Sequence, residues 1–170
     1  MHAKYVLKSF LNHIESELTE LRGSKSLLAV SGGRDSMVLW HLFESLKLPY
    51  AVAHCNFGLR GEESDAETAL VEEKARLNND ILFVERFGSL DFKKGESTQE
   101  NARNLRYAFF EKLKHAHGFD RVVTAHHFMD QWEHLFIYLY RNNVSTALRG
   151  MPSSISGTYR PMLKLSAHEI

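Results

Sequence analysis

One hexapeptide of the chain has residue types suited to holding a phosphate group: Ser31-Gly32-Gly33-Arg34-Asp35-Ser36. It follows a short apolar run and precedes a segment with helical spacing. Glycines at such a junction let backbone N–H groups and the helix N-terminus face an anion. Asp35 would repel a phosphate unless a cation lay between them, so its expected task is to hold Mg²⁺. The competing interpretation is a plain strand-to-helix turn, with Ser36 or Asp35 as the helix cap.

Two better-known phosphate-binding motifs are missing from the sequence. It contains no G-x-x-x-x-G-K-[ST] pattern, which excludes the loop of the common NTPases, and no G-x-G-x-x-G pattern, which argues against a dinucleotide site. The hexapeptide therefore predicts a phosphate loop of another type.

Two pairs of charged side chains stand three residues apart on expected helices, so each pair shares a helix face. Asp130 and Glu133 are suited to binding an ammonium group, although a solvated acidic face is the alternative. Arg103 and Arg106 are cations. We expect Arg103 to stabilise negative charge on a phosphate group, while exposed arginines without a role remain an equal alternative for Arg106.

Several histidines lie near these segments. His54 ends an expected strand and is predicted to bind the nucleotide, with a structural role equally open. His126 and His127 are expected to shape the nucleotide pocket. His126, Asp130 and His134 recur every four residues, but such a row spreads over about 12 Å. We therefore do not expect the three to share one metal ion.

The elements that must position these residues alternate between helix and strand. Short apolar runs predict four strands, at residues 26–30, 50–54, 81–85 and 121–125. Helical spacing or capping boxes predict five helices, from about Val6 to Leu21 and over residues 36–46, 64–77, 97–117 and 127–141. The fold class is therefore α/β, a parallel sheet with helices on both faces. With strand order 3-2-1-4, the ligand crevice lies between the first and fourth strands.

The bulk properties limit the choice of function. The 170 residues fit one domain, have zero formal net charge and contain one cysteine, Cys55. Unselective nucleic-acid binding by overall charge, a disulfide framework and a cysteine-cluster zinc site are therefore not expected. The first residues are charged throughout, unlike a signal peptide, and no apolar run approaches a membrane span. We expect a cytoplasmic protein without a membrane partner.

The hexapeptide resembles the S-G-G-x-D-S signature of the PP-loop ATP pyrophosphatase superfamily. Three later stretches and the R-P-M-L at Arg160 are similar, in the same order, to motifs of the tRNA(Ile)-lysidine synthetase family. These stretches are H-C-N-F-G-L-R-G-E-E-S-D from His54, E-N-A-R-N-L-R-Y from Glu100 and T-A-H-H-F-M-D-Q-W-E from Thr124. The sequence departs from that family at Phe57, Met129 and His134, which leaves details of the site open but not the class.

This resemblance implies an adenine nucleotide α-hydrolase-like, Rossmann-like fold that uses ATP and Mg²⁺. It implies a ligase that adenylates C2 of the wobble cytidine of tRNA(Ile), and then replaces the adenylate with free L-lysine. Asp35 and Arg103 are the expected catalytic residues, Asp35 also the Mg²⁺ ligand, and Asp130 and Glu133 the expected lysine site. The expected ATP-binding residues are Ser31, Gly32, Gly33, Arg34, Asp35, Ser36, His54 and His126.

Two other functions stay open, namely a tRNA thiolase of the same superfamily and an ATP-binding module without catalysis. A thiolase generally needs two cysteines, which Cys55 alone does not provide. Members of the synthetase family carry further C-terminal domains, so we expect residues 1–170 to be a single catalytic domain truncated at its C-terminus. Such a chain is expected to bind ATP but to modify tRNA inefficiently. Whether it forms a homo-oligomer stays open.

Two structural expectations concern the last part of the chain. Ser166 to Glu169 has the pattern of a capping box with almost no helix after it. We therefore expect residues from about Ser153 onward to be poorly ordered or held by a neighbour. In the preceding helix, Trp132, Phe136 and Tyr140 form an apolar stripe that we expect to lie in the core.

Overall fold

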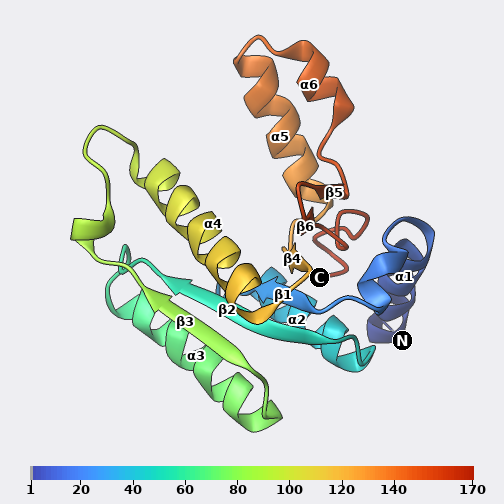
Figure 1. Cartoon of the computed structure of the whole chain (residues 1–170). Helices are drawn as coiled ribbons and strands as arrows, with labels where there is room; N and C mark the ends of the chain where they lie inside the picture. Colours follow the sequence, from blue (N-terminus) through green and yellow to red (C-terminus); the bar gives the residue numbers. More distant parts are fainter. Residues whose placement is uncertain (1) are drawn as a thin grey trace.

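The computed structural model describes residues 2–170, which form one mostly parallel sheet with helices around it (Figure 1). The helices are α1 (His2–Glu17), α2 (Arg34–Ser45), α3 (Glu62–Asn78), α4 (Thr98–His117), α5 (Phe128–Tyr140) and α6 (Val144–Arg149), with short 3-10 helices η1 (Thr19–Arg22) and η2 (Ser89–Asp91). The strands are β1 (Ser26–Ala29), β2 (Tyr50–Asn56), β3 (Leu82–Arg86), β4 (Arg121–Val123), β5 (Ser154–Ile155) and β6 (Thr158–Tyr159).

The strand order is β3-β2-β1-β4-β6-β5, which confirms the predicted 3-2-1-4 arrangement and extends it by two strands. All neighbouring pairs are parallel except β5 and β6, which form an antiparallel pair at one edge. Because β1 and β4 are neighbours whose connections run to opposite sides, their carboxyl ends open a crevice there. The loops after β1 and β4 carry the predicted site.

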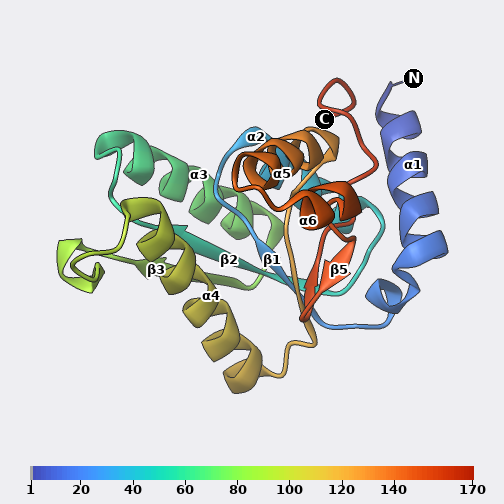
Figure 2. The same ribbon diagram turned by 90° about the horizontal axis from the view of Figure 1, so that it is seen from above.

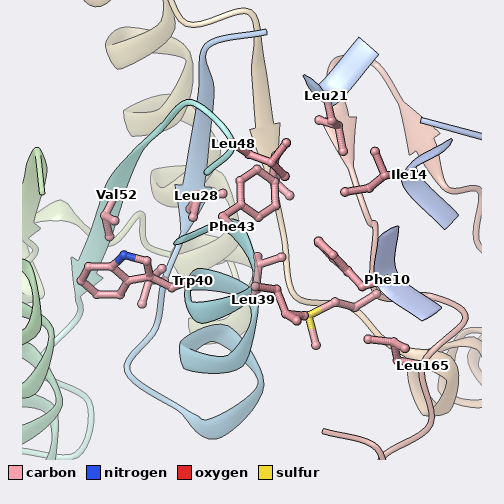
Figure 3. Packing of buried hydrophobic residues seen from close by; sticks show 14 of the residues in the cluster. Phe10, Ile14, Leu21, Leu28, Leu39, Trp40, Phe43, Leu48, Val52 and Leu165 are labelled. Atoms are coloured by element: carbon pink, nitrogen blue, oxygen red, sulfur yellow. The ribbon is translucent and has the colours of Figure 1, made fainter. Parts of the chain in front are cut away.

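The sheet has a separate apolar core on each face. Successive residues of a strand point to opposite faces, and in β1 Leu28 packs with α1, α2 and α3 while Leu27 packs with α4. Figure 3 shows the first of these cores, where Trp40 and Phe43 of α2 lie under the sheet. Both residues are fully buried, as is Phe10 of α1. Helices therefore cover both faces, as the sequence predicts.

Capping decides where two helices begin, and the two capping boxes differ in outcome. The Ser97 side chain accepts a hydrogen bond from the Glu100 N–H, so α4 begins as predicted. The prediction for α3 is wrong, because this helix begins at Glu62 with Gly61 as its N-cap residue. Gly61 has a positive φ of 53°, a conformation that glycine adopts at little cost. Ser64 lies inside the first turn, where its hydroxyl accepts from the Arg60 N–H.

The prediction that residues from about Ser153 onward are poorly ordered or held by a neighbour is wrong. They form β5 and β6, and the segment after β6 fills the core beside α1. Met162 and Leu165 are 0% and 1% exposed, and Leu165 lies near Phe10 in Figure 3. The pattern at Ser166 forms only a turn, in which the Ser166 N–H donates to the Glu169 carboxylate over 2.6 Å.

Helices α5 and α6 form an arm that stands away from the sheet. Figure 1 shows the arm rising above β4, and Figure 2 shows α5 nearly end-on, as expected for a projecting helix. The prediction that the stripe on α5 lies in the core is wrong, since Trp132, Phe136 and Tyr140 are 46%, 63% and 92% exposed. Within residues 2–170, no helix combines the length and apolar character needed to cross a membrane.

Candidate active site

A cavity of about 540 Å³ opens at the carboxyl ends of β1, β2 and β4. This volume is within the usual range for small-molecule sites. Nearly all of the residues predicted from the sequence contribute to its wall: Ser31, Gly33, Arg34, Asp35, Ser36, His54, Arg103, His126 and Asp130. Gly32, His127 and Glu133 are not part of the wall. The fold thus brings four separate segments of the sequence together around one space.

The phosphate loop is shaped by its own serines and by one glycine. The Ser36 hydroxyl donates to the Gly33 carbonyl over 2.8 Å and accepts from the Ser31 N–H over 3.2 Å. Gly32 has φ +92°, and a Cβ built on it would lie 2.9 Å from the Cβ of Glu67. The backbone therefore passes so close to α3 that a side chain at residue 32 would force the loop or α3 to move.

Asp35 lies in the first turn of α2, beside a histidine from the loop after β4. Its Oδ2 is 3.5 Å from Nε2 of His127, and its Oδ1 accepts from Nε of Arg34 over 3.2 Å. Nδ1 of His127 accepts the Met129 N–H over 3.1 Å. The ring proton is thereby assigned to Nε2, the nitrogen that faces Asp35. This contact joins the phosphate loop to the start of α5.

His54 lines the cavity but is only 2% exposed and has both ring nitrogens in hydrogen bonds. Nδ1 donates to the Val30 carbonyl over 2.8 Å, because a carbonyl can only accept. Nε2 lies 2.9 Å from the hydroxyl of Thr68, which also contacts the Ser64 carbonyl over 2.9 Å. Burial lowers the pKa of His54 and so favours the neutral form of the ring. The structure leaves His54 no free ring nitrogen for a ligand.

His126 is placed differently, on the cavity wall just after β4. Its Nδ1 is 2.8 Å from the hydroxyl of Thr124, while Nε2 has no hydrogen-bond partner among the described residues. Burial is the largest influence on its pKa, which is lowered; nearby Asp130 acts in the opposite direction. A neutral, half-buried imidazole at this place is suited to packing against a nucleotide.

Arginines are concentrated around the cavity, although Arg160 itself is not part of its wall. Arg103 and Arg106 line it from α4, and their guanidinium groups lie over the rings of Tyr107 and Phe57 at 5.4 and 5.5 Å from the ring centroids. Arg160 is 8% exposed and donates to the Pro152 carbonyl over 3.0 Å, and its Nε has no partner among the described residues. Burial lowers the pKa of Arg160, with Arg103 acting in the same direction. This concentration of positive charge favours an anionic ligand.

The two predicted lysine-site carboxylates are not equivalent. Asp130 lines the cavity, and its Oδ2 accepts the His127 N–H over 2.6 Å at the start of α5. Glu133 is exposed, lies outside the cavity wall and makes no hydrogen bond or ion pair within the described part of the chain. Sharing a helix face was therefore not enough to bring both carboxylates to the cavity.

The sequence did not identify some residues that order the site. Asn56 ends β2 and holds the next loop, since its amide donates to Asp65 and its carbonyl accepts from the Gly58 N–H. Arg60 pairs with Glu67 over 2.6 Å at the cavity wall. Asn56 lies two residues after the predicted strand, inside the stretch from His54 that resembles a family motif, which was the available signal. For the pair of Arg60 and Glu67, the opposite charges of the two residues were the sole signal in the sequence.

A glycine-bent loop after β1, a carboxylate in the first turn of α2 and a cavity at the strand ends define a nucleotide-binding α/β domain with a phosphate loop. Comparison with protein families agrees with this class. The family described as "PP-loop domain" matches residues 3–170. The chain belongs to this family.

Several curated relatives share one name. A tRNA(Ile)-lysidine synthase from Chlorobaculum tepidum is 38% identical over 169 residues, covering 96% of this chain and 51% of the relative. A protein of the same name from Bacteroides thetaiotaomicron is 33% identical, covering 94% of this chain and 38% of the relative. The chain thus spans about half, or less, of the length of these relatives.

Solved structures support the fold. The U34-tRNA thiolase NcsA from Methanococcus maripaludis, solved with its [4Fe-4S] cluster, has a TM-score of 0.76 at 17% identity, covering 99% of this chain and 61% of that one. An NH3-dependent NAD synthetase from Campylobacter jejuni has a TM-score of 0.59 at 13% identity, covering 99% and 70%. At these identities the likeness describes the architecture, an adenine nucleotide α-hydrolase-like sheet.

Proposed function

We propose that this chain is the ATP-using catalytic domain of a ligase that modifies tRNA(Ile). In the proposed reaction, the C2 oxygen of the wobble cytidine attacks the α-phosphorus of ATP and pyrophosphate leaves. The amine of free L-lysine then attacks C2 and displaces AMP. The observation that carries the proposal is the meeting of the phosphate loop, Arg103 and Asp130 around one cavity. The names of the relatives supply the substrates, and a cytoplasmic location follows from such substrates.

The loop from Ser31 to Ser36 is proposed to bind the phosphates of ATP, with His126 beside the nucleotide. His54 supports the loop through the Val30 carbonyl rather than through a bond to ATP. Asp35 suits Mg²⁺, because one carboxylate next to a phosphate loop is a common protein contribution to a magnesium–nucleotide site. The ion would neutralise phosphate charge there. His127, whose Nε2 lies 3.5 Å from Oδ2 of Asp35, is proposed to hold this carboxylate in place.

Arg103 is proposed to stabilise the charge that develops on the α-phosphate, since it lines the cavity from α4. Asp130 is proposed to bind an ammonium group of lysine from the opposite side. Glu133, one turn further along α5, contributes from outside the wall. The amine that attacks must first lose a proton, because its ordinary pKa is about 10.4.

A thiolase is the less favoured function for this cavity. Cys55 is the single cysteine of the chain, and burial raises the pKa of its thiol to about 12. A thiol held in its protonated form is a poor sulfur nucleophile. The likeness to NcsA concerns the fold and does not change this argument.

The test is incorporation of labelled lysine into tRNA(Ile), measured together with AMP release. It uses the chain alone and a chimera in which the chain replaces the matching half of the Chlorobaculum tepidum relative. We expect both readouts from the chimera, and ATP binding with little transfer from the chain alone. AMP release without lysine incorporation would contradict the proposed second step, and ATP binding without AMP release in the chimera would favour a non-catalytic module.

Asp35→Asn provides the matched variant for this test. The amide keeps the size of the side chain but removes the charge proposed to hold Mg²⁺, so AMP release and lysine incorporation should both disappear. Circular dichroism of the variant should match the wild type, because Asp35 is partly exposed and outside both cores. AMP release at the wild-type rate would contradict the proposed role of Asp35.

A further inference from the structure

Three phenylalanines, Phe57, Phe87 and Phe92, form a cluster beside the cavity. Phe57 lies in the loop after β2 and lines the cavity, and its ring stacks on that of Phe87 with centroids 5.0 Å apart and planes at 12°. The ring of Phe92 meets it edge-on, with centroids 6.5 Å apart and planes at 85°. All three residues are half-buried. Because two neighbouring rings restrain Phe57, its own ring is a fixed part of the cavity wall.

The side chain of Arg106 rests on this cluster. Its guanidinium carbon lies over the ring of Phe57, 5.5 Å from the ring centroid, a distance at which an aromatic ring attracts a cation. The contact joins α4 to the loop after β2, two elements far apart in the chain. Arg103 differs, since its guanidinium lies over Tyr107, one turn along the same helix. Of these two arginines, Arg106 is the one whose position depends on another element.

The charge of Arg106 is not paired within the protein. Its guanidinium lines the cavity, yet it forms no ion pair and no side-chain hydrogen bond within residues 2–170. The carboxylate of Glu67 on the cavity wall is already paired with Arg60 over 2.6 Å. A ring under a guanidinium orients it but leaves its N–H groups free to donate, and the planar fork of these groups matches a phosphate. The arrangement therefore favours an anionic ligand at Arg106.

A phosphate group of a small nucleotide suits this place best. The cavity of about 540 Å³ also contains the phosphate loop, and its size is that of a small-molecule site. A nucleobase stacked on Phe57 fits less well, because this ring already contacts Phe87, Phe92 and Arg106. In the sequence, Phe57 is a departure from the synthetase motif, and Arg106 is the arginine whose role stays open.

We propose that Phe57 is a positioning residue, whose ring holds the guanidinium of Arg106 in place to bind a phosphate group of ATP. Phe57 acts through Arg106 and need not touch the nucleotide itself. The proposal deepens the proposed function and rests on it, because it takes ATP as the ligand of the cavity. It gives Arg106 a binding role beside the role proposed for Arg103.

Calorimetric titration of the chain with ATP tests the role of Phe57. Phe57→Leu keeps an apolar side chain but removes the ring, so the dissociation constant should rise about two- to fivefold. Arg106→Met removes a charged donor and should raise it roughly ten- to a hundredfold. Adding Phe57→Leu to Arg106→Met should cause no further loss, because the two residues act as a unit. Phe57→Tyr, which keeps the ring, should bind ATP like the wild type.

Phe83→Leu is the matched control. Phe83 is a half-buried phenylalanine of β3 that packs edge-on to Phe119, with centroids 6.0 Å apart, and lies outside the cavity wall. Its substitution should also remove an aromatic contact from the fold, but it should leave the dissociation constant for ATP unchanged. Circular dichroism verifies that the variants are folded, and Phe57→Met repeats the titration if Phe57→Leu does not fold.

Side-chain NMR supplies a readout that needs no ATP. The Nε–H signal of Arg106 is assigned by its absence in Arg106→Met. It should shift in Phe57→Leu, because the ring beneath the guanidinium is gone, and it should stay close to its wild-type position in Phe57→Tyr. Loss of packing elsewhere, as in Phe83→Leu, should not move it.

Wild-type affinity for ATP in Phe57→Leu, or an equal loss of affinity in Phe83→Leu, overturns the proposal. An Arg106 signal that Phe57→Leu leaves unshifted overturns it as well. A wild-type chain that does not bind ATP contradicts the proposed function and this role together, whereas ATP binding that is insensitive to Phe57→Leu contradicts the role of Phe57 alone. Unchanged ATP binding with weaker tRNA binding would assign Arg106 to an RNA phosphate instead.

Discussion

Gly32 is the residue of the phosphate loop whose backbone conformation least tolerates a side chain. Its φ of +92° is unfavourable for any side chain, and a Cβ would meet α3 at Glu67. We predict that Gly32→Ala lowers the free energy of unfolding by about 1–3 kcal/mol and weakens ATP binding, because the loop must move away from α3. Urea unfolding measures the first effect and calorimetric titration with ATP the second.

Gly33 provides the control for Gly32. It has φ −72°, and its added Cβ would meet only the Ser31 hydroxyl, at 3.4 Å. Gly33→Ala should therefore cost much less stability than Gly32→Ala. Equal losses from the two substitutions would show that the loop does not depend on the close passage beside Glu67.

Asp130 both caps α5 and faces the cavity, so the choice of variant matters. Asp130→Asn keeps an oxygen that can accept the His127 N–H, yet it removes the charge. We predict that it raises the lysine requirement roughly ten- to a hundred-fold, as the loss of a charged hydrogen bond of about 1.5–3 kcal/mol would. The requirement for ATP should change little.

Glu133→Gln is the comparison for Asp130→Asn, measured by steady-state kinetics with lysine and ATP varied in turn. Since Glu133 lies outside the cavity wall, its neutralisation should affect the lysine requirement less than that of Asp130. If Asp130→Asn changed both requirements equally, the residue would serve ATP or the fold rather than lysine.

Most of the residues around the cavity could be predicted from sequence because they follow buried strands or share a motif. The contact between His127 and Asp35 could not be predicted in this way. It joins segments far apart in the chain, and its 3.5 Å distance depends on how β1 and β4 sit side by side. Glu133 shows a second limit of prediction from sequence. Helical spacing predicts that Asp130 and Glu133 share a helix face, but it does not predict how far the cavity extends along that face.

At the scale of elements, the first four strands and five helices were predictable because each carries a strong local signal. Buried parallel strands are short apolar runs, and α4 begins at a serine that caps it. β5 and β6 have two residues each, too few for any periodicity. The stripe on α5 was wrongly assigned to the core, because apolar spacing indicates a buried face without saying what buries it.

The segment after β6 contributes to the folded core, and a substitution at Met162 tests this contribution. It is completely buried in the core that includes α1 and α2. We predict that Met162→Ala lowers the free energy of unfolding by about 2–5 kcal/mol, the usual cost of a cavity of this kind. Leu148→Ala is the control at a residue 75% exposed on α6 and should stay within about 0.5 kcal/mol. A small effect at Met162 in denaturant unfolding would mean that the segment adds little to the core.

At the scale of the whole molecule, buried histidines should link stability to pH. Burial lowers the pKa of both His54 and His126 below the ordinary value of 6.5. As the pH falls below about 6.5, the unfolded chain binds protons before the folded protein does. The free energy of unfolding therefore decreases with falling pH in this window, by at most about 1.4 kcal/mol per pH unit for each extra proton. Above the window the contribution is fully present.

Urea unfolding at pH 7.5, 6.5, 5.5 and 5.0 measures this dependence. His54→Asn should be less stable than the wild type at pH 7.5, because it loses the ring that joins Val30 to Thr68. It should also show a shallower decline below pH 6.5, since one of the two contributing imidazoles is gone. His115→Asn, at an exposed residue of α4, should keep the wild-type slope. A wild-type free energy of unfolding that does not change between pH 7.5 and 5.0 would mean that the folded protein accepts protons on His54 and His126 as readily as the unfolded chain.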